Sequence, residues 1–304
     1  MHRRFVTLDV FTEKRFAGNP LAVVLEPEGL DTAAMQTIAR EFNLSETVFV
    51  FPPTDTAHRA RLRIFTPGLE LPFAGHPTVG TAVLLGRIDG GDKARAFVLE
   101  ETVGPVPCRV GPTGADSGRA TFDIPRLPEL TGSVADNATL AAALNLDPQD
   151  IGFEVLGFAG CTASRWSAGT PLTFVPVRGL EAIARCRPDL ARFDAAFGGG
   201  AFCAAFVVCG ETAEAANTFH ARMFAPGVGI MEDPATGGGA AAFAGYLAAH
   251  GGYRDGEHLV RIEQGYEMGR PSLMELTLRI AGGKLAAASI GGSAVVITEG
   301  TIEA

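Results

Sequence analysis

Short apolar segments separated by Gly or Pro dominate this sequence, and they constrain its fold more than any other feature. Such segments, rich in Val, Phe and Leu, are typical of β-strands. Because strands and helical patterns do not alternate strictly, a doubly wound parallel sheet is not favoured. The strands that we expect are 4–10, 20–25, 47–52, 59–66, 96–100, 105–110, 119–124, 153–158, 171–177, 203–209, 217–224, 258–263, 273–280 and 294–298.

Helical patterns are fewer. Asp31 precedes one of them and has the side chain of a helix N-cap, which accepts a hydrogen bond from a free N–H of the first turn. Together with the strands, these segments predict a mixed α+β protein. The helices that we expect are 32–42, 77–87, 137–144, 179–184 and 235–249.

The length of 304 residues suggests about two domains. A stretch at 111–133 is rich in Gly, Pro, Ser and Thr, as domain boundaries often are. We therefore expect an N-terminal half over 1–125, completed by 288–304, and a C-terminal half over 126–287.

Composition and charge argue against several classes of protein. A net charge of −9 leaves nothing to neutralise phosphates, so no nucleic-acid partner is expected. The N-terminus lacks the long apolar run of a secretion signal, and no stretch of about 18 apolar residues could span a membrane. Five cysteines without CxxC favour reduced thiols in the cytoplasm. The six histidines show no HxxxH or HExxH spacing, so we expect no bound metal.

Two helix starts about half the chain apart resemble each other. The segment His76–Ala82 can be laid over Asp233–Gly239 at an offset of 157 residues (233 − 76). In each segment a polar residue is followed by Pro, which suits the first position of a helix, so His76 and Asp233 are expected at or near the N-caps. This pattern favours a duplicated domain, although two unrelated Pro-initiated helices would look the same.

Glycines at both helix starts suggest a ligand site. Gly75 and Gly80 on one side, and Gly237–Gly239 on the other, would let the backbone approach a ligand closely. Free N–H groups and the helix dipole attract anions. Two such starts could hold a small carboxylate between the halves without a metal. The alternative is that these glycines only allow close helix packing.

Glu46 is the candidate acid/base residue. It precedes the apolar segment Thr47–Phe51, where a carboxylate can be partly desolvated, which raises its pKa towards that of a working general base. The alternative is a solvated glutamate in a turn. No GxSxG or P-loop motif is present, and Gly237–Ala242 fits GxGxxA without the apolar strand that a dinucleotide site requires. We therefore expect no cofactor.

Several motifs occur in the same order as in the phenazine-biosynthesis PhzF-like family, which this chain resembles over nearly its whole length. The resemblance favours the duplication. The segments that carry it are Phe16–Val24 (FAGNPLAVV), Asn43–Thr47 (NLSET), Phe73–Ala82 (FAGHPTVGTA), Phe224–Pro226, Glu232–Gly237 (EDPATG), Gln264–Gly265 and Gly269–Ser272 (GRPS).

The resemblance implies a diaminopimelate epimerase-like fold of two similar halves, each a mostly antiparallel β-barrel around a central helix, with the active site between them. It also implies a homodimer. It maps the acid/base glutamate onto Glu46 and the active-site histidine and aspartate onto His76 and Asp233. The family prototype isomerises a dihydro-hydroxyanthranilate without a cofactor. The substrate-binding residues that we expect are Asn19, Gly75, Thr78, Gly80, Thr236, Gly237 and Gly238.

Two departures bear on function. Related racemases have cysteines at the two helix starts, where this chain has His76 and Asp233, so a two-thiol racemase is not favoured. The family commonly has Ser at the position of Gly238, so the prototype's own substrate is in question. The expected function is a cofactor-independent isomerase that transfers a proton on a small carboxylate. The alternatives are an epimerase, a lyase or a non-catalytic small-molecule binding protein.

Overall fold

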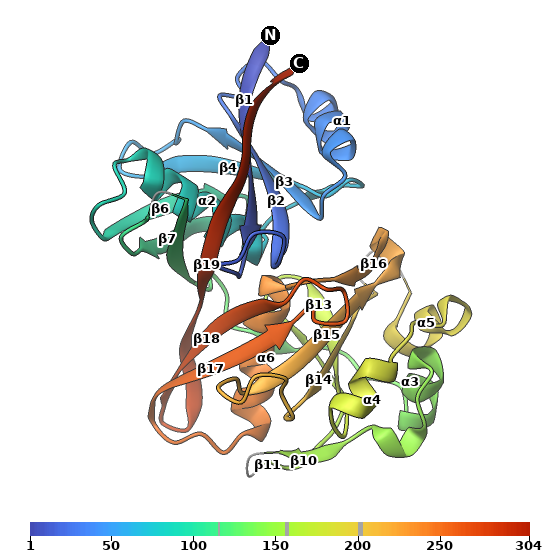
Figure 1. The fold of residues 1–304 in the computed structure, drawn as a ribbon. Coiled ribbons are helices and arrows are strands. Elements are labelled where there is room, and N and C mark those ends of the chain that lie inside the picture. The colour runs from blue at the N-terminus through green and yellow to red at the C-terminus, as the bar shows by residue number, and fades with distance from the viewer. Residues whose placement is uncertain (115, 156–157, 200–202) are drawn as a thin grey trace. The chain divides into compact units, whose positions relative to one another are not determined.

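The computed structural model describes residues 1–304 except 115, 156–157 and 200–202 (Figure 1). It is mixed α+β, as the sequence predicts. The chain divides into two compact units, Met1–Pro125 with Ile290–Ala304, and Arg126–Ser289. No helix in the described part of the chain combines the length and apolarity needed to cross a membrane.

The first unit is a closed barrel of eight strands. Strand pairs β2–β3 and β4–β6 are parallel, and the pairs β1–β19, β1–β2, β3–β4, β6–β7 and β7–β8 are antiparallel. Pairing of β8 with β19, and of β19 with β1, closes the barrel. The strands are β1 (His2–Val10), β2 (Asn19–Leu25), β3 (Glu46–Phe51), β4 (Ala60–Phe65), β6 (Arg95–Glu101), β7 (Gly104–Val110), β8 (Ser117–Asp123) and β19 (Lys284–Glu303), with the short β5 (Glu70–Leu71) beside β4.

Helix α2 (Gly75–Ile88) is the central helix of this barrel. It contacts β1, β2, β3, β6, β7 and β8, and every residue from Gly75 to Gly86 is buried. Gly80 permits the close packing, because an added Cβ would lie 2.6 Å from Leu21 Cδ2 and 2.7 Å from Val10 Cγ2. Burial on all sides explains why α2 is apolar all round instead of amphipathic.

Helix α1 (Thr32–Phe42) covers the outer face of the same barrel. Its side chains Met35 and Ala39 pack on Val24, Phe49 and Phe65. The expected N-cap is confirmed, since the Asp31 carboxylate accepts a hydrogen bond from the N–H of Ala34. The barrel wall thus has two apolar faces, one against α2 and one against α1.

The second unit repeats the pairing order of the first. Its successive strands pair antiparallel, parallel, antiparallel, parallel and antiparallel, as β1, β2, β3, β4, β6 and β7 do. The short strand β16 (Ile230–Asp233) lies beside β15, as β5 lies beside β4. The expected duplication is confirmed. The strands are β12 (Ser164–Ser167), β13 (Pro171–Pro176), β14 (Ala205–Cys209), β15 (Phe219–Ala225), β17 (Gly256–Gln264) and β18 (Ser272–Ala281).

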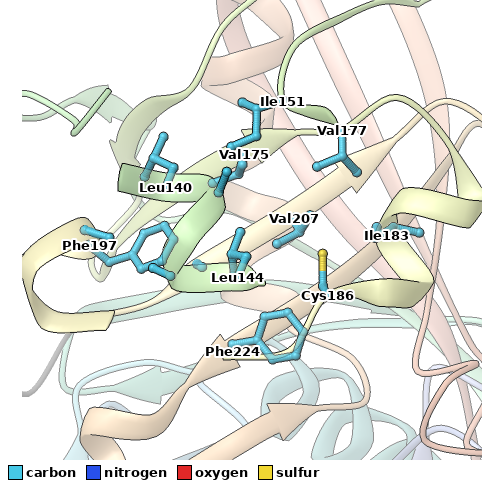
Figure 2. Packing of buried hydrophobic residues seen from close by; sticks show 14 of the residues in the cluster. Leu140, Leu144, Ile151, Val175, Val177, Ile183, Cys186, Phe197, Val207 and Phe224 are labelled. Atoms are coloured by element: carbon cyan, nitrogen blue, oxygen red, sulfur yellow. The ribbon is translucent and has the colours of Figure 1, made fainter. Parts of the chain in front are cut away.

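A second apolar cluster lies where three helices pack on the strands of this unit (Figure 2). Leu140 and Leu144 come from α3 (Asn137–Leu144), and Phe197 ends α5 (Leu190–Phe197). They pack with Val175 and Val207 from the neighbouring strands β13 and β14. The remaining elements are α4 (Leu180–Arg185), β9 (Glu129–Leu130), β10 (Phe153–Val155), β11 (Phe158–Cys161) and two 3-10 turns, Pro148–Asp150 and Pro226–Val228.

The helix starts differ from the sequence prediction. α2 begins at Gly75 after the N-cap Ala74, and α6 (Gly237–His250) begins at Gly237 after the N-cap Thr236. The two 14-residue helices are therefore offset by 162 residues (237 − 75), and the offset of 157 is wrong. Neither proline takes the first helical position, because Pro77 is the third residue of α2 and Pro234 precedes the N-cap of α6. At the corrected offset, Gly238 corresponds to His76.

Three other differences from the sequence prediction remain. Helix α5 was not expected, although Asp189, directly before it, is an N-cap whose side chain accepts a hydrogen bond from the N–H of Ala191. The expected strand at 153–158 includes residues 156 and 157, which lie outside the described residues, while Phe153–Val155 and Phe158–Cys161 are strands. The expected strand 294–298 is part of the much longer β19.

The two glycines Gly80 and Gly238 provide a matched stability test. Gly80→Ala should lower the free energy of unfolding by about 1–3 kcal/mol, because the methyl group overpacks a closed core. Gly238→Ala should raise it by up to about 1 kcal/mol, because Ala favours helix more than Gly does. An added Cβ at Gly238 meets no atom of the described chain within 4 Å. Urea unfolding of both variants measures the difference, and equal effects would contradict this packing.

Candidate active site

Strand alternation turns Glu46 towards the central helix of the first unit. Glu46 is the first residue of β3 and pairs with Leu21 on β2, whose side chain meets α2 at Gly80. Successive strand residues face opposite sides. Phe49 belongs to the outer cluster under α1, so Glu46 and Val48 face α2.

His76 meets Glu46 at the start of α2. Its Nε2 lies 3.3 Å from Glu46 Oε2, with the side chains 4% and 12% exposed respectively. Burial lowers the pKa of His76 to about 3, although a hydrogen bond to the main chain of Pro20 raises it. Since Nε2 makes no hydrogen bond among the described residues, Nδ1 is the nitrogen bonded to Pro20. A neutral His76 therefore presents the lone pair of Nε2 to Glu46.

Asn19 belongs to the same group. It begins β2, is fully buried, and shares the inner face with Leu21, two residues along the strand. Because Leu21 is the pairing partner of Glu46, Asn19 lies about 7 Å along the strand from the position beside Glu46. The structure thus brings the three sequence-predicted residues Asn19, Glu46 and His76 together in one unit.

The other expected residues of this unit have internal contacts. Thr78 is fully buried, and its hydroxyl oxygen lies 2.7 Å from the carbonyl oxygen of Ala74 and 2.6 Å from Glu101 Oε1. Gly80 packs on the barrel wall, and Gly75 begins α2. Sequence reasoning missed Glu101; its signal is an acidic residue at an inward-facing position of a strand.

In the second unit, Asp233 is part of a hydrogen-bonded group at the start of α6. Asp233 Oδ2 accepts a hydrogen bond of 2.6 Å from the hydroxyl of Thr236. Gln264 Nε2 donates to the carbonyl oxygen of Asp233 at 2.6 Å and to the Thr236 hydroxyl at 3.1 Å. The N–H of Thr236 donates to Gln264 Oε1 at 3.2 Å. Gln264 was missed as a site residue, although it stands in a recognised motif.

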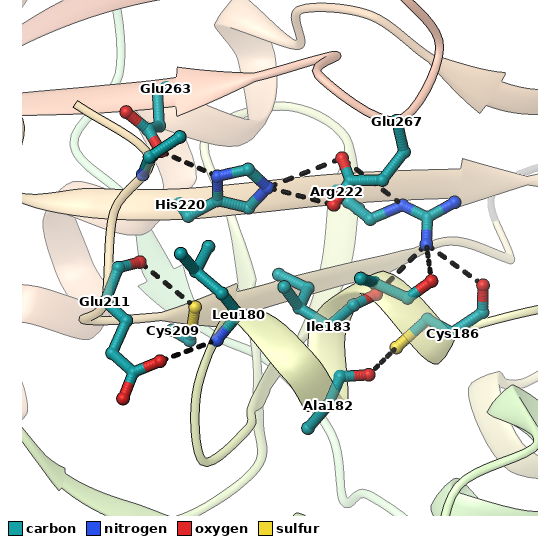
Figure 3. Close-up of polar contacts among 12 residues, drawn as sticks. Leu180, Ala182, Ile183, Cys186, Cys209, Glu211, His220, Arg222, Glu263 and Glu267 are labelled. Carbon is teal, nitrogen blue, oxygen red and sulfur yellow. Dashed lines mark hydrogen bonds and ion pairs between the residues drawn. The ribbon is translucent and has the colours of Figure 1, made fainter.

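Ion pairs lie beside this group, and Figure 3 shows those of His220 with Glu263 and Glu267. Arg222 forms two hydrogen bonds of 2.8 Å with Glu232, the neighbour of Asp233. His220 lies between Glu263, the neighbour of Gln264, at 2.7 Å and Glu267 at 3.1 Å. Each residue of the Asp233–Gln264 contact therefore adjoins an ion-paired neighbour that fixes its strand.

The starts of both central helices could accept an anion. Among the described residues, neither N-cap, Ala74 or Thr236, caps its own helix with its side chain, and the N–H groups of a helix's first turn suit an anion. Gly238 leaves space in the first turn of α6. No group of three possible metal ligands occurs in the described ranges. A pocket of about 230 Å³ lies at the other end of α2 from His76, by Leu84 and Arg87.

Comparison with known proteins identifies the family. Residues 8–300 match the family model of phenazine biosynthesis-like proteins, PhzC-PhzF. This chain belongs to that family. It is 49% identical to a PhzF-family relative named only as an uncharacterized isomerase of Mesorhizobium japonicum, over 99% of this chain and 98% of the relative.

Two further comparisons support the same conclusion. The chain is 36% identical to the trans-2,3-dihydro-3-hydroxyanthranilate isomerase of Pseudomonas aeruginosa, over 99% of both chains. It matches the crystal structure of the Bacillus anthracis phenazine biosynthesis protein of the PhzF family with a TM-score of 0.86 and 25% identity, over 100% of both chains. The PhzF-like resemblance and the epimerase-like α+β fold are confirmed, and the chain is an enzyme of the isomerase class.

Stability should depend on pH through His220. Burial alone would lower its pKa, but hydrogen bonds to Glu263 and Glu267 outweigh burial and raise it to about 9. Between pH 6.5 and about 9 the folded protein therefore holds a proton that the unfolded chain releases. The stability that this proton provides is fully present below pH 6.5, and it falls by at most about 1.4 kcal/mol per pH unit up to about pH 9.

Urea unfolding of wild type and His220→Gln across this pH range measures the effect. The wild type should lose stability relative to the variant as pH rises. Parallel curves would show that His220 is neutral in the folded protein.

Proposed function

We propose that this chain catalyses proton transfer on a small carboxylate substrate without a cofactor, and that Glu46 removes and returns the proton. One observation carries the proposal, the buried contact between Glu46 and a neutral His76. An acid/base group works best when burial brings its pKa near the working pH.

The pair can exchange a proton with a substrate in two steps. As a carboxylate, Glu46 takes a proton from a carbon next to an unsaturated or carbonyl-conjugated group. The resulting acid then returns it to a second carbon of the same substrate, so that protons balance and only a double bond moves. His76 orients the carboxyl group through Nε2, while its bond to Pro20 holds the ring in one tautomer. Exclusion of water keeps the proton on this path.

The group around Asp233 is suited to bind a polar substituent. Thr236 and Gln264 fix the orientation of the Asp233 carboxyl group, which can then accept a hydrogen bond from such a substituent. N–H groups in the first turn of a helix suit a carboxylate, and they would stabilise negative charge that develops during proton removal.

The substrate class is an unsaturated carboxylate with a proton that can move between two carbons. Relatives 33–36% identical over their full length are named trans-2,3-dihydro-3-hydroxyanthranilate isomerases. That compound is therefore the first probe. Gly238 provides no hydroxyl at a position where the family commonly has Ser, which favours a substrate with less polar substituents there.

The variant Glu46→Gln tests the proposal. It keeps the size of the side chain but cannot accept a proton, so turnover should fall by about 10²–10⁴-fold. The assay uses trans-2,3-dihydro-3-hydroxyanthranilate, followed by small carboxylates that raise the melting temperature. A ligand at 100 times its Kd adds about 2.7 kcal/mol of stability.

The control is Glu28→Gln, which changes an exposed carboxylate and should leave turnover unchanged. Wild-type turnover by folded Glu46→Gln would exclude Glu46 as the base. Ligand binding by the wild type, without turnover of any carboxylate that binds, would instead indicate a binding protein.

A further inference from the structure

The two units carry equivalent residue pairs at the ends of equivalent strands. In the first unit Leu99 pairs with Ala60, and in the second Ile262 pairs with Phe219. Glu101 lies two residues after Leu99, and Gln264 lies two residues after Ile262. The strand pairs are equivalent, so Glu101 occupies the position that Gln264 has in the other unit.

The residues just before this position confirm the equivalence. Glu100 accepts hydrogen bonds from the N–H groups of Thr54 and Asp55, and Glu263 accepts them from Ala213 and Glu214. The two loop residues of the second unit follow those of the first by the same 159 positions (213 − 54 and 214 − 55). His58 contacts Glu100 and Asn217 contacts Glu263, and these two residues are also 159 positions apart.

Glu101 and Gln264 also bind the same part of the central helix. Gln264 accepts the N–H of Thr236, the N-cap of α6. A main-chain hydrogen bond from Ala74, the N-cap of α2, reaches Glu101. In the second unit the contact is made by a neutral amide, which accepts with its oxygen and donates with its nitrogen.

The contacts of Thr78 give the protonation state of Glu101. The Thr78 hydroxyl has one proton, yet its oxygen lies within hydrogen-bonding distance of two acceptors, the Ala74 carbonyl at 2.7 Å and Glu101 at 2.6 Å. Both contacts are hydrogen bonds only if Glu101 donates its own proton to Thr78. Glu101 Oε2 is buried and has no hydrogen-bond partner in the described chain, which a carboxylic acid tolerates better than a carboxylate.

Among the described residues, no charged side chain contributes to the pKa of Glu101. Burial raises the pKa of Glu101 to about 8, against the lowering effects of Thr78 and Ala74. Cys108 on β7 is a titratable neighbour of Glu101. Burial raises the pKa of its thiol above the usual value, and Glu101 raises it further, so the thiol stays neutral. The next residue, Glu100, shows the contrast, because hydrogen bonds from Asp55 and Thr54 lower its pKa to about 2.

We propose that Glu101 is a neutral carboxylic acid that positions the first turn of α2, and through it His76, and that ionisation of Glu101 displaces this turn. This inference rests on the proposed role of His76 beside Glu46. Glu101 holds Ala74 and Thr78, the residues two before and two after His76. If Glu101 lost its proton, the Thr78 hydroxyl could donate to only one of its two neighbours. The other contact, with the Ala74 carbonyl or with Glu101, would then bring two oxygen lone pairs together. Glu101 is thus a positioning residue, and it does not touch the substrate.

The variant Glu101→Gln installs the side chain that the equivalent position already has in the second unit. It should fold, and it cannot ionise. Between pH 4.5 and about 8 the folded wild type holds a proton on Glu101 that the unfolded chain has released. The folding equilibrium constant of the wild type, relative to Glu101→Gln, should therefore fall about tenfold per pH unit across that window.

Glu100→Gln is the matched control. The pKa of Glu100 is lowered to about 2 from 4.5, so this group contributes stability that is present above pH 4.5 and is lost as pH falls towards 2. The control should therefore differ in slope from wild type only below pH 4.5. If wild type and Glu101→Gln have parallel stability curves between pH 4.5 and 8, Glu101 is ionised in the folded protein and the proposal is wrong.

The effect on His76 is measured directly by NMR, without a substrate. The His76 ring signals are assigned by their absence in His76→Gln. In the wild type they should shift with a midpoint near pH 8, the pKa of Glu101, although His76 does not titrate there. In Glu101→Gln this transition should vanish, while in Glu100→Gln it should remain.

The outcomes separate this inference from the proposed function. A pH 8 transition that persists in Glu101→Gln, or is absent from the wild type, would overturn the positioning role of Glu101. Neither the unfolding curves nor the NMR signals depend on turnover. Failure of Glu46→Gln to lose activity would therefore refute the catalytic assignment and leave these measurements interpretable.

Discussion

Enclosure of an apolar helix by a closed barrel is the constraint on which the site in the first unit depends. The first turn of α2 is buried, so contacts within the protein replace water for several of its polar groups. Pro20 does so for His76, and Glu101 does so for Ala74 and Thr78. The same enclosure places Glu46 in a low-dielectric interior, where its electrostatic interaction with His76 is stronger than it would be in water.

The two units carry different side chains at equivalent positions. At equivalent helix positions the first unit has His76 and the second has Gly238. At equivalent strand ends, Glu101 and Gln264 contact the N-caps of the two central helices. In each unit a strand-end side chain contacts the helix N-cap, while the side chains in the first helical turn differ. The first unit therefore places His76 beside Glu46, and the second has open space at Gly238 and a hydrogen-bonded carboxyl group at Asp233.

Local patterns in the sequence predicted local structure well. The cap at Asp31 located α1, and the recognised motifs gave the family and the α+β fold. The exact equivalence of the helices was missed, because proline is a strong signal whose position relative to a helix start varies from the first turn to the preceding loop, as Pro77 and Pro234 show. Glu101 was missed because its inward direction depends on barrel closure, which no local pattern encodes.

Strand β19 has a consequence for the order in which the protein can form. Its first residues belong to the second unit, and Ile290–Ala304 complete the first by pairing with β1. A ribosome synthesises these residues only after the whole of residues 126–289. The N-terminal barrel must therefore wait with an unpaired β1 edge, exposed to chaperones and to other nascent chains. The unit that is synthesised first is thus the one completed last.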